Sequence, residues 1–483
     1  MTPPPEELVL SAGQGEVARP NGGDSFWTVV REALAGSRRD LTAMPLARAI
    51  LLLAVPMVLE MSMESIFAIA DIFWVSKLGA DAVATVGLTE SLLTVLYAAS
   101  MGLAMGAGAV VARRIGGKDP EGASRAAVQA IALGLAFSVV VGTVGALLAP
   151  RMLAILGASS SVVKTGATFA RVMLGGSASI VLLFVINAAF RGAGDAAITL
   201  RTLWLANGLN ILLGPVFVFG LGPAPRLGVT GAAVATTIGR GIGVLYQLWK
   251  LRKGAGRLRI LRRHLRVDPD SLRTIVRISR SGMVQMLIGM TSWIGLVRIL
   301  ALFGSAALAG YTIAMRVVMF ALLPSWGLGN AAATLVGQNL GAGSPERVEQ
   351  AVWRAARYNL IFLGAVGAAL VLFAPAVIRL FTQDAGIVAQ GGPCLRIVAA
   401  GFGFYAYGMV VLQAFNGAGD TRTPTWVNLG CFWLGELPLA YLLCRATGLG
   451  TRGVYVAIAL AFSASALVSI LLFRRGTWKR VRV

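Results

Sequence analysis

The stretch Phe190-Arg-Gly-Ala-Gly-Asp195 returns as Phe415-Asn-Gly-Ala-Gly-Asp420, an offset of 225 residues in a chain of 483. The same offset carries Ile115-Gly116 onto Leu340-Gly341 and Pro150 onto Pro375. These landmarks keep register, so no net insertion separates the two copies across this span. The chain is therefore two halves built on one repeated unit.

The composition is that of a membrane protein. The chain is 57% hydrophobic, only 13% of its residues are charged, and its mean hydropathy is +0.76. A soluble chain carries about 25% charged residues. Apolar runs of about 20 residues recur, each long enough to cross a bilayer core of about 30 Å. The sequence predicts an all-α integral membrane protein, and repeats in such a chain are typical of alternating-access transporters.

Twelve apolar segments divide the chain into two lobes of six helices. We predict spans near residues 45–77, 83–113, 122–149, 161–189, 197–220, 228–250, 271–302, 306–338, 347–373, 386–414, 424–445 and 451–474. The predicted domains are a flexible cytoplasmic tail (1–44), a first lobe (45–250), a basic linker (251–270), a second lobe (271–475) and a basic tail (476–483). An even number of helices per repeat makes the two lobes parallel, related by an axis along the membrane normal.

The net charge of +22 comes from Lys and Arg gathered in alternate connections, above all in the 251–270 linker. Basic loops stay in the cytoplasm, so both termini are predicted to be cytoplasmic. The expected partner of this charge is the anionic headgroups of the bilayer, and nucleic acid is not expected. The three cysteines lack metal-ligand spacing and read as small buried hydrophobes, so no metal site or cofactor is predicted.

Glycine segments mark the helix ends. Two segments at the repeat offset each predict the end of one helix and the beginning of the next. They are Gly116-Gly117-Lys118-Asp119-Pro120 and its counterpart, which ends in Ser344-Pro345. We predict Asp119, Ser344, Asp195 and Asp420 as N-caps of the helices that follow. A phosphate-binding loop is the alternative, but no Gly-Lys-Ser/Thr sequence supports it.

The first span carries three acids, Glu60, Glu64 and Asp71. At 100° per residue they lie within about 40° of one another, on one stripe of a helix. Three acids in mid-membrane cost about 8–10 kcal/mol, which favours a water-accessible cavity that binds protons or cations. Glu90 opens the second span and joins them as a candidate. The alternative is a structural pairing of Glu60 and Glu64 with arginines such as Arg298 or Arg316.

The second half lacks this stripe, because Glu60 becomes Gln285 at the repeat offset, and its membrane acid is Glu436. Ion coupling is therefore expected mainly in the first half. Polar residues in the spans hold helices together or line a cavity, and aromatic rings bind organic cations through their faces. The candidates for the substrate cavity are Asn187, Asn210, Gln285, Glu436, Trp74 and Tyr97.

Together these features resemble the multidrug and toxic compound extrusion (MATE) family, in its acid-rich bacterial branch, over residues 45–475. The resemblance rests on Ile69-Ala-Asp71-Ile-Phe-Trp-Val-Ser-Lys-Leu-Gly79, on Val336-Gly-Gln-Asn-Leu-Gly-Ala-Gly343, and on the two Gly-Ala-Gly-Asp segments. It implies two six-helix lobes forming a V around a central cavity, a bacterial inner-membrane location, and action as a monomer.

The resemblance also implies a secondary antiporter, not an enzyme, which exports amphipathic, often cationic, compounds in exchange for H⁺ or Na⁺. Asp71 matches the family's coupling acid and is the candidate position for any bound Na⁺. Asn210 matches the family's Asn in the fifth span, but Gly214 stands where an Asp would precede Pro215. The alternative function is a flippase or exporter of a lipid-linked or polyanionic substrate, whose cavity would carry arginines.

Overall fold

The computed structural model describes residues 25–37, 39–481 and 483, without the side chains of residues 68–72, 76 and 80. The first lobe contains α2 (Leu46–Ser76), α3 (Ala80–Gly116), α4 (Pro120–Ile155), α5 (Ser160–Gly175), α6 (Ser177–Ala193), α7 (Ala196–Phe219) and α8 (Val229–Lys253). The second contains α9 (Pro269–Ala301), α10 (Ser305–Gly341), α11 (Pro345–Arg379), α12 (Ala385–Ala400), α13 (Phe402–Ala418), α14 (Arg422–Asn428), η2 (Leu429–Glu436), α15 (Leu437–Ala446) and α16 (Thr451–Arg474).

The repeat is visible in the helix bounds. The bounds of α3, α5 and α6 plus 225 residues are those of α10, α12 and α13. The predicted fourth and tenth spans are each broken at the same place, Gly176 and Gly401, where glycine interrupts the helix. The α12–α13 pair is bent by 57°.

The helices account for the predicted spans. In the described chain ten segments are long and apolar enough to cross a membrane, and the bent α12–α13 pair makes an eleventh. The twelfth predicted span is α8, whose glycines, threonines and Arg240 lower its hydropathy. The all-α, two-lobe prediction is confirmed.

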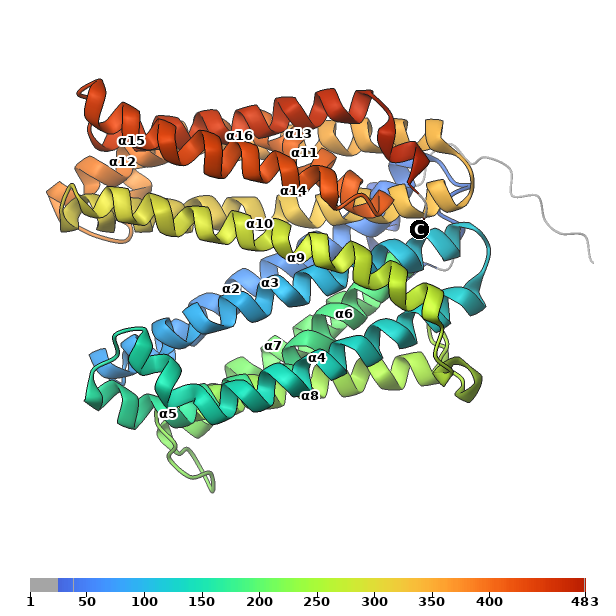
Figure 1. The fold of residues 1–483 in the computed structure, drawn as a ribbon, viewed down its shortest axis with the longest axis horizontal. Coiled ribbons are helices and arrows are strands. Elements are labelled where there is room, and N and C mark those ends of the chain that lie inside the picture. The colour runs from blue at the N-terminus through green and yellow to red at the C-terminus, as the bar shows by residue number, and fades with distance from the viewer. Residues whose placement is uncertain (1–24, 38, 482) are drawn as a thin grey trace, which may run out of the picture.

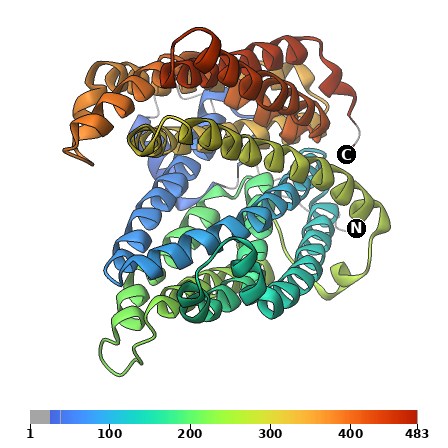
Figure 2. The same cartoon turned by 60° about the vertical axis from the view of Figure 1, so that its left-hand side comes forward.

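The two lobes form a V (Figure 1). The first helix of each lobe crosses towards the other: α2 packs against α10, and α9 packs against α3. Apolar residues of α2 such as Ala49 and Leu53 therefore share a core with Val410 of the second lobe. Figure 2 shows the linker and the C-terminal end on the side where the lobes meet, which we call the closed end.

Two glycines permit the contact at the closed end. A β-carbon on Gly116 would overlap the carbonyl oxygen of Gln338, and a β-carbon on Gly341 would overlap that of Arg113. Gln338 is Arg113 plus 225, so the two contacts are repeat counterparts. The Arg113 guanidinium also donates to the Ala418 and Val481 carbonyls, at 3.3 and 2.9 Å.

Part of the predicted flexible tail (1–44) is helical. Phe26–Ala35 forms α1, because Val29 and Ala33 lie four residues apart on one face and are buried. Glu32 on this helix accepts from Arg48 Nη2 of α2 at 2.6 Å. Residues 1–24 of the predicted tail lie outside the described residues. At the other end Trp478 is fully buried, so the predicted basic tail packs on the second lobe.

Two of the four predicted N-caps form. Asp119 accepts from the Gly122 amide at 2.7 Å, and Asp420 accepts from the Thr423 amide at 3.1 Å. Ser344 and Asp195 make no side-chain capping bond. Asp195 instead accepts from the Arg257 amide of the linker at 2.7 Å, because the linker folds back onto this helix start.

The linker spans residues 254–268 between α8 and α9, slightly shorter than predicted, and its last residue holds α9 in place. Asp268 accepts from Ser271 Oγ at 2.6 Å and from the Ser271 amide at 3.2 Å. Arg114 of α3 donates to the same Ser271 hydroxyl at 2.6 Å. The Ser271 hydrogen bonds, with the Arg114 guanidinium nearby, hold the pKa of Asp268 below its usual value.

Gly116→Ala tests the closed end. Because its β-carbon would meet a backbone carbonyl that cannot rotate away, we expect a loss of about 1–3 kcal/mol in stability or more. Thermal unfolding of the purified protein in detergent measures this. Gly364→Ala, in a helical position with open space around it, is the control and should change little. Equal behaviour of the two variants would contradict a close contact at the closed end.

The linker contact predicts a pH dependence. A lowered pKa in the folded state means that Asp268 adds stability above its unfolded pKa, about 3.9. That stability is lost as the pH falls through the lower, folded value. The comparison variant is Asp268→Asn, which keeps a capping side chain but has no titrating carboxyl. We expect the wild type to be more stable than this variant above the unfolded pKa, and the difference to shrink as the pH falls below it. Unfolding midpoints over a pH series measure it, and a constant difference would refute it.

Candidate functional site

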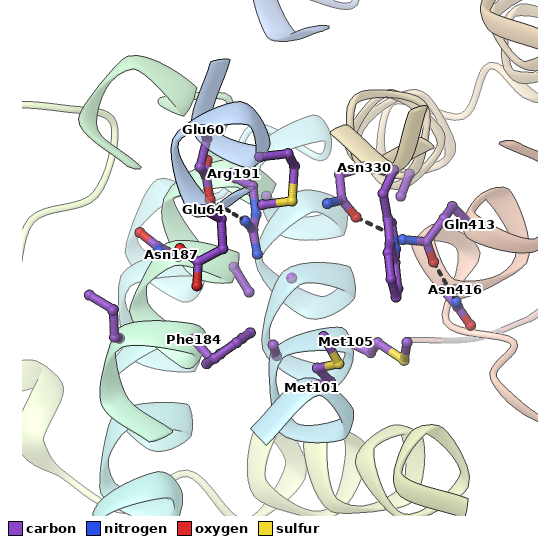
Figure 3. A pocket seen from close by; sticks show the side chains of 18 of the residues that line it. Glu60, Glu64, Met101, Met105, Phe184, Asn187, Arg191, Asn330, Gln413 and Asn416 are labelled. Carbon is purple, nitrogen blue, oxygen red and sulfur yellow. Dashed lines mark hydrogen bonds and ion pairs between the residues drawn. The ribbon is translucent and has the colours of Figure 1, made fainter. Parts of the chain in front are cut away.

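A cavity of about 410 Å³ lies between the lobes. Its walls come from α2, α3, α6, α7 and α8 on one side and from α9, α10 and α13 on the other. Figure 3 shows its charged and amide side chains facing one another across this space. We call it the central cavity.

A buried ion pair lies on its first-lobe wall. Glu60 of α2 is fully buried, and its Oε1 accepts from Arg191 Nη1 at 2.7 Å. Its Oε2 accepts from Thr199 Oγ1 of α7, also at 2.7 Å. Arg191 is in the last turn of α6, so three helices meet at one carboxylate. Both oxygens of Glu60 are therefore held by donors.

Glu64 lies one helical turn further along α2 and also lines the cavity. It is half-buried, and its Oε2 accepts from Asn207 Nδ2 of α7 at 2.9 Å. Glu60 and Glu64 thus share one face, as their spacing predicts. The third member of the predicted stripe, Asp71, lies in α2, but its side chain is outside the described residues.

A second guanidinium reaches the cavity from α8. Arg240 is 8% exposed, and its Nη1 donates to the Tyr97 hydroxyl at 3.2 Å. Its charge lies 6.0 Å from the centre of the Phe67 ring and 5.9 Å from that of Tyr97. Aromatic faces attract a cation at this range, so they hold the guanidinium at the wall.

The second-lobe wall is neutral. Asn330 Oδ1 accepts from Gln413 Nε2, and Gln413 Oε1 accepts from Asn416 Nδ2, each at 2.7 Å. Met286, Met290 and Trp326 also line this wall. Among the described lining residues, every charged side chain therefore belongs to the first lobe.

The ion pair adjoins the lobe boundary. The carbonyl of Arg191 accepts from Thr334 Oγ1 of α10 at 3.1 Å. The next carbonyl, that of Gly192, accepts from Gln338 Nε2 of α10 at 2.9 Å. Because Gln338 also packs against Gly116, the peptide that follows Arg191 is hydrogen-bonded to a residue of the closed end.

Of the six predicted cavity residues, two line this cavity: Tyr97, and Asn187, which accepts from Gln247 Nε2 at 2.6 Å. Asn210 is buried and donates to Thr236 at 2.6 Å. Trp74 packs edge-on against Phe219.

Gly214 is the position where the resemblance leads one to expect an acid. The Trp74 ring lies 3.4 Å from the place that a β-carbon would take there. An indole thus fills the space beside Gly214, and the fifth-span carboxylate has no counterpart at this position.

Three further candidates lie away from the central cavity. Gln285 is buried in α9, Glu436 is buried inside the second lobe, and Glu90 is exposed on α3. In the described part of the chain no group of three or more His, Cys, Asp or Glu is placed to hold a metal ion.

Arg191 is the important residue that sequence reasoning missed. The alternative prediction, a structural pairing of Glu60 with an arginine, is met, but its partner is Arg191. Arg298 and Arg316, the arginines named for that pairing, are exposed on α9 and α10. The repeat itself contained the signal. At the 225 offset Glu60 becomes Gln285 and Arg191 becomes Asn416, so both charges are present in one half and absent from the other.

The MatE family model matches residues 56–216 and 281–442. A probable multidrug resistance protein YoeA from Bacillus subtilis is 25% identical over 90% of this chain and 95% of its own length. A probable multidrug resistance protein NorM from Thermotoga maritima is 27% identical over 89% of this chain and 92% of its own length.

A solved structure of a MOP superfamily transporter from Pyrococcus furiosus, described as having a binding pocket of reverse polarity, superimposes with a TM-score of 0.85. It is 29% identical and covers 93% of this chain and 98% of its own. The family model alone spans more than half of the sequence and both repeats. The chain is a membrane transporter of the multidrug and toxic compound extrusion (MATE) family.

Proposed function

We propose that this protein is a proton-coupled antiporter that exports amphipathic organic cations by alternating access. The observation that carries the proposal is the Glu60–Arg191 pair. It lies on the cavity wall, its carboxylate is fully buried, and the carbonyl of Arg191 itself accepts a hydrogen bond from the opposite lobe. No nucleotide-binding motif offers another energy source.

Charge gives the proposed orientation. The closed end carries Arg113, Arg114 and the basic linker, so the positive-inside rule assigns it and both termini to the cytoplasm. The lobes then diverge towards the outside, and the conformation is outward-facing. The linker arginines would lie at the anionic headgroups of the inner leaflet. Function as a monomer is part of the proposal.

Coupling follows from the cost of a buried charge. While Glu60 is ionised, Arg191 neutralises it at 2.7 Å. A proton on Glu60 removes that attraction and leaves the largely buried Arg191 charge without its partner, which is unfavourable. The end of α6 would then move, and its hydrogen bonds to Thr334 and Gln338 would transmit the change to α10.

A proton fits this site better than Na⁺. Both oxygens of Glu60 accept from side-chain donors, so a sodium ion would have to displace the Arg191 guanidinium to gain oxygen ligands. Glu64 and Asp71, further along α2, are the proposed relay towards the open end, with Na⁺ at Asp71 as the alternative. A charge moving through 100 mV supplies about 2.3 kcal/mol.

The cavity walls suit varied amphipathic substrates. Met101, Met105, Met286 and Met290 line it together with Trp326. Unbranched methionine side chains adapt to ligands of different shape. Glu64, which is half-buried and bonded only to a neutral amide among its described contacts, would be the anionic contact of a bound cation.

A second candidate substrate class is anionic. Arg240 on the cavity wall favours it, as does the likeness to the Pyrococcus furiosus transporter described as having a pocket of reverse polarity. The Arg240 guanidinium, held by Tyr97 and Phe67, would then bind an acidic group.

Transport in everted vesicles tests the coupling. We expect Glu60→Gln to abolish ethidium efflux driven by a proton gradient, because the site can no longer exchange a proton. Glu346→Gln, at an exposed helix start, is the control and should transport normally. Proton-driven efflux by Glu60→Gln at the wild-type rate would refute the coupling role of Glu60. If the wild type transports ethidium only under a sodium gradient, the coupling ion is Na⁺ and not H⁺.

The same vesicles decide the substrate class. We expect Glu64→Gln to weaken ethidium transport and Arg240→Gln to leave it, because Glu64 is the carboxylate among the described lining residues that forms no ion pair with an arginine. If an anionic dye is transported by the wild type and lost in Arg240→Gln, the second candidate is correct.

A double-mutant cycle measures the ion pair. Arg191→Gln leaves the Glu60 charge buried and unpaired, so we expect about 3–5 kcal/mol lower stability. The double variant Glu60→Gln/Arg191→Gln should recover most of this loss, because neither charge remains. Thermal unfolding in detergent gives the loss of stability, relative to the wild type, of each single variant and of the double variant. Additive losses would mean that the two side chains do not stabilise one another.

A further inference from the structure

The second-lobe wall of the central cavity carries a row of three amides that the transport proposal does not use. Gln413 lies in the middle of the row. Its Nε2 donates to Asn330 Oδ1, and its Oε1 accepts from Asn416 Nδ2, each at 2.7 Å. All three side chains line the cavity, and Figure 3 shows them across it from Arg191. The row therefore joins α10 to α13 along one wall.

Both ends of the row have an unused hydrogen-bonding atom. Asn416 is 5% exposed, and its Oδ1 has no hydrogen-bond partner, although buried polar groups are almost always partnered. At the other end Asn330 is half-buried, and its Nδ2 donates to no acceptor in the described part of the chain. An amide nitrogen carries two donors. The row thus ends in a free donor at the cavity surface.

The fold itself does not require these amides. At the repeat offset, Asn330 corresponds to Met105 and Gln413 to Ala188, and both of these apolar residues line the first-lobe wall of the same cavity. The same helix positions therefore pack without amides in one lobe. In the second lobe the amides cost desolvation energy, and Asn416 Oδ1 recovers no hydrogen bond in return.

An indole lies one helical turn from the free donor. Trp326 and Asn330 are four residues apart on α10, so they share a face of the helix, and both line the cavity. Trp326 is half-buried and has no aromatic or cationic partner among the described residues. Its repeat counterpart is Met101. The second-lobe wall thus combines a flat apolar face with a hydrogen-bond donor, and such a combination fixes the orientation of a planar ligand.

We propose that Trp326, Asn330 and Gln413 form a subsite for an uncharged planar aromatic group that carries a hydrogen-bond acceptor, such as a ring carbonyl. The ring stacks on the indole, and Asn330 Nδ2 donates to the acceptor. Gln413 is a positioning residue, because it binds the oxygen of the Asn330 amide and so orients its nitrogen.

The inference rests on the proposed transport of amphipathic compounds and deepens it. Glu64 on the first-lobe wall holds the charged part of the substrate, and the second-lobe wall selects its ring. A few polar groups placed in a largely apolar pocket are what gives such a pocket specificity.

The test measures binding to the purified full chain in detergent, without an ion gradient. Two fluorescent probes carry the same trimethylammonium-alkyl chain. One ends in an N-alkylated acridone, whose ring has a carbonyl, and the other in anthracene, which has three fused rings and no acceptor. Fluorescence anisotropy gives the Kd of each probe, and the ratio of the two Kd values is the readout.

The variants use the residue types that the first lobe has at the same positions. Asn330→Met removes the donor, so we expect it to weaken the acridone probe relative to the anthracene probe by about 3–10-fold, the value of one hydrogen bond. Gln413→Ala should shift the ratio in the same direction, because the Asn330 amide loses its fixed orientation. Trp326→Met should weaken both probes, because the stacking face is lost. Met290→Leu, on the same wall, is the control and should leave the ratio unchanged.

The ratio decides the outcome. The proposal fails if the wild type binds neither probe, if Asn330→Met keeps the wild-type ratio, if Trp326→Met leaves both Kd values unchanged, or if Met290→Leu shifts the ratio as much. If Asn330→Met does not fold, Gln413→Ala decides by the same ratio. A failure of the coupling at Glu60 is seen in gradient-driven efflux and not in this ratio, so the two failures are distinguishable.

Discussion

The structure depends on the close approach of two backbones at the closed end. Gly116 and Gly341 end their helices where each meets a carbonyl oxygen of the other lobe, and no other residue type leaves room for this. From this contact the lobes diverge, so the central cavity has a floor and two walls. The crossing of α2 and α9 between the lobes strengthens the same junction with apolar packing.

The ion pair is placed by that geometry. Glu60 and Arg191 are on helices of one lobe, but the carbonyls at Arg191 and Gly192 bond to α10 of the other. A change of charge at Glu60 therefore acts beside the hydrogen bonds that join the end of α6 to α10 of the other lobe. A carboxylate elsewhere on the cavity wall, such as Glu64, has no such connection among its described contacts and suits ligand binding better.

Much of the fold could be predicted because it is periodic. Apolar runs and the glycine landmarks gave the spans to within a few residues, and the repeat relates the bounds of α3 to those of α10. The shared face of Glu60 and Glu64 followed from helical spacing alone. What failed were contacts between distant segments. Asp195 bonds the linker and caps nothing, and α1 is ordered by packing on α2, which local sequence does not reveal.

The partner of Glu60 was unpredictable from one helix, yet it is visible when the two halves are compared, and this has an evolutionary consequence. Each half presents the same glycine and the same carbonyl to its counterpart, which is the isologous contact of a twofold homodimer. An ancestor made of two identical subunits would have had to carry the buried charges twice or not at all. Two halves in one chain can differ, so Glu60 and Arg191 stand in one copy while Gln285 and Asn416 occupy the other.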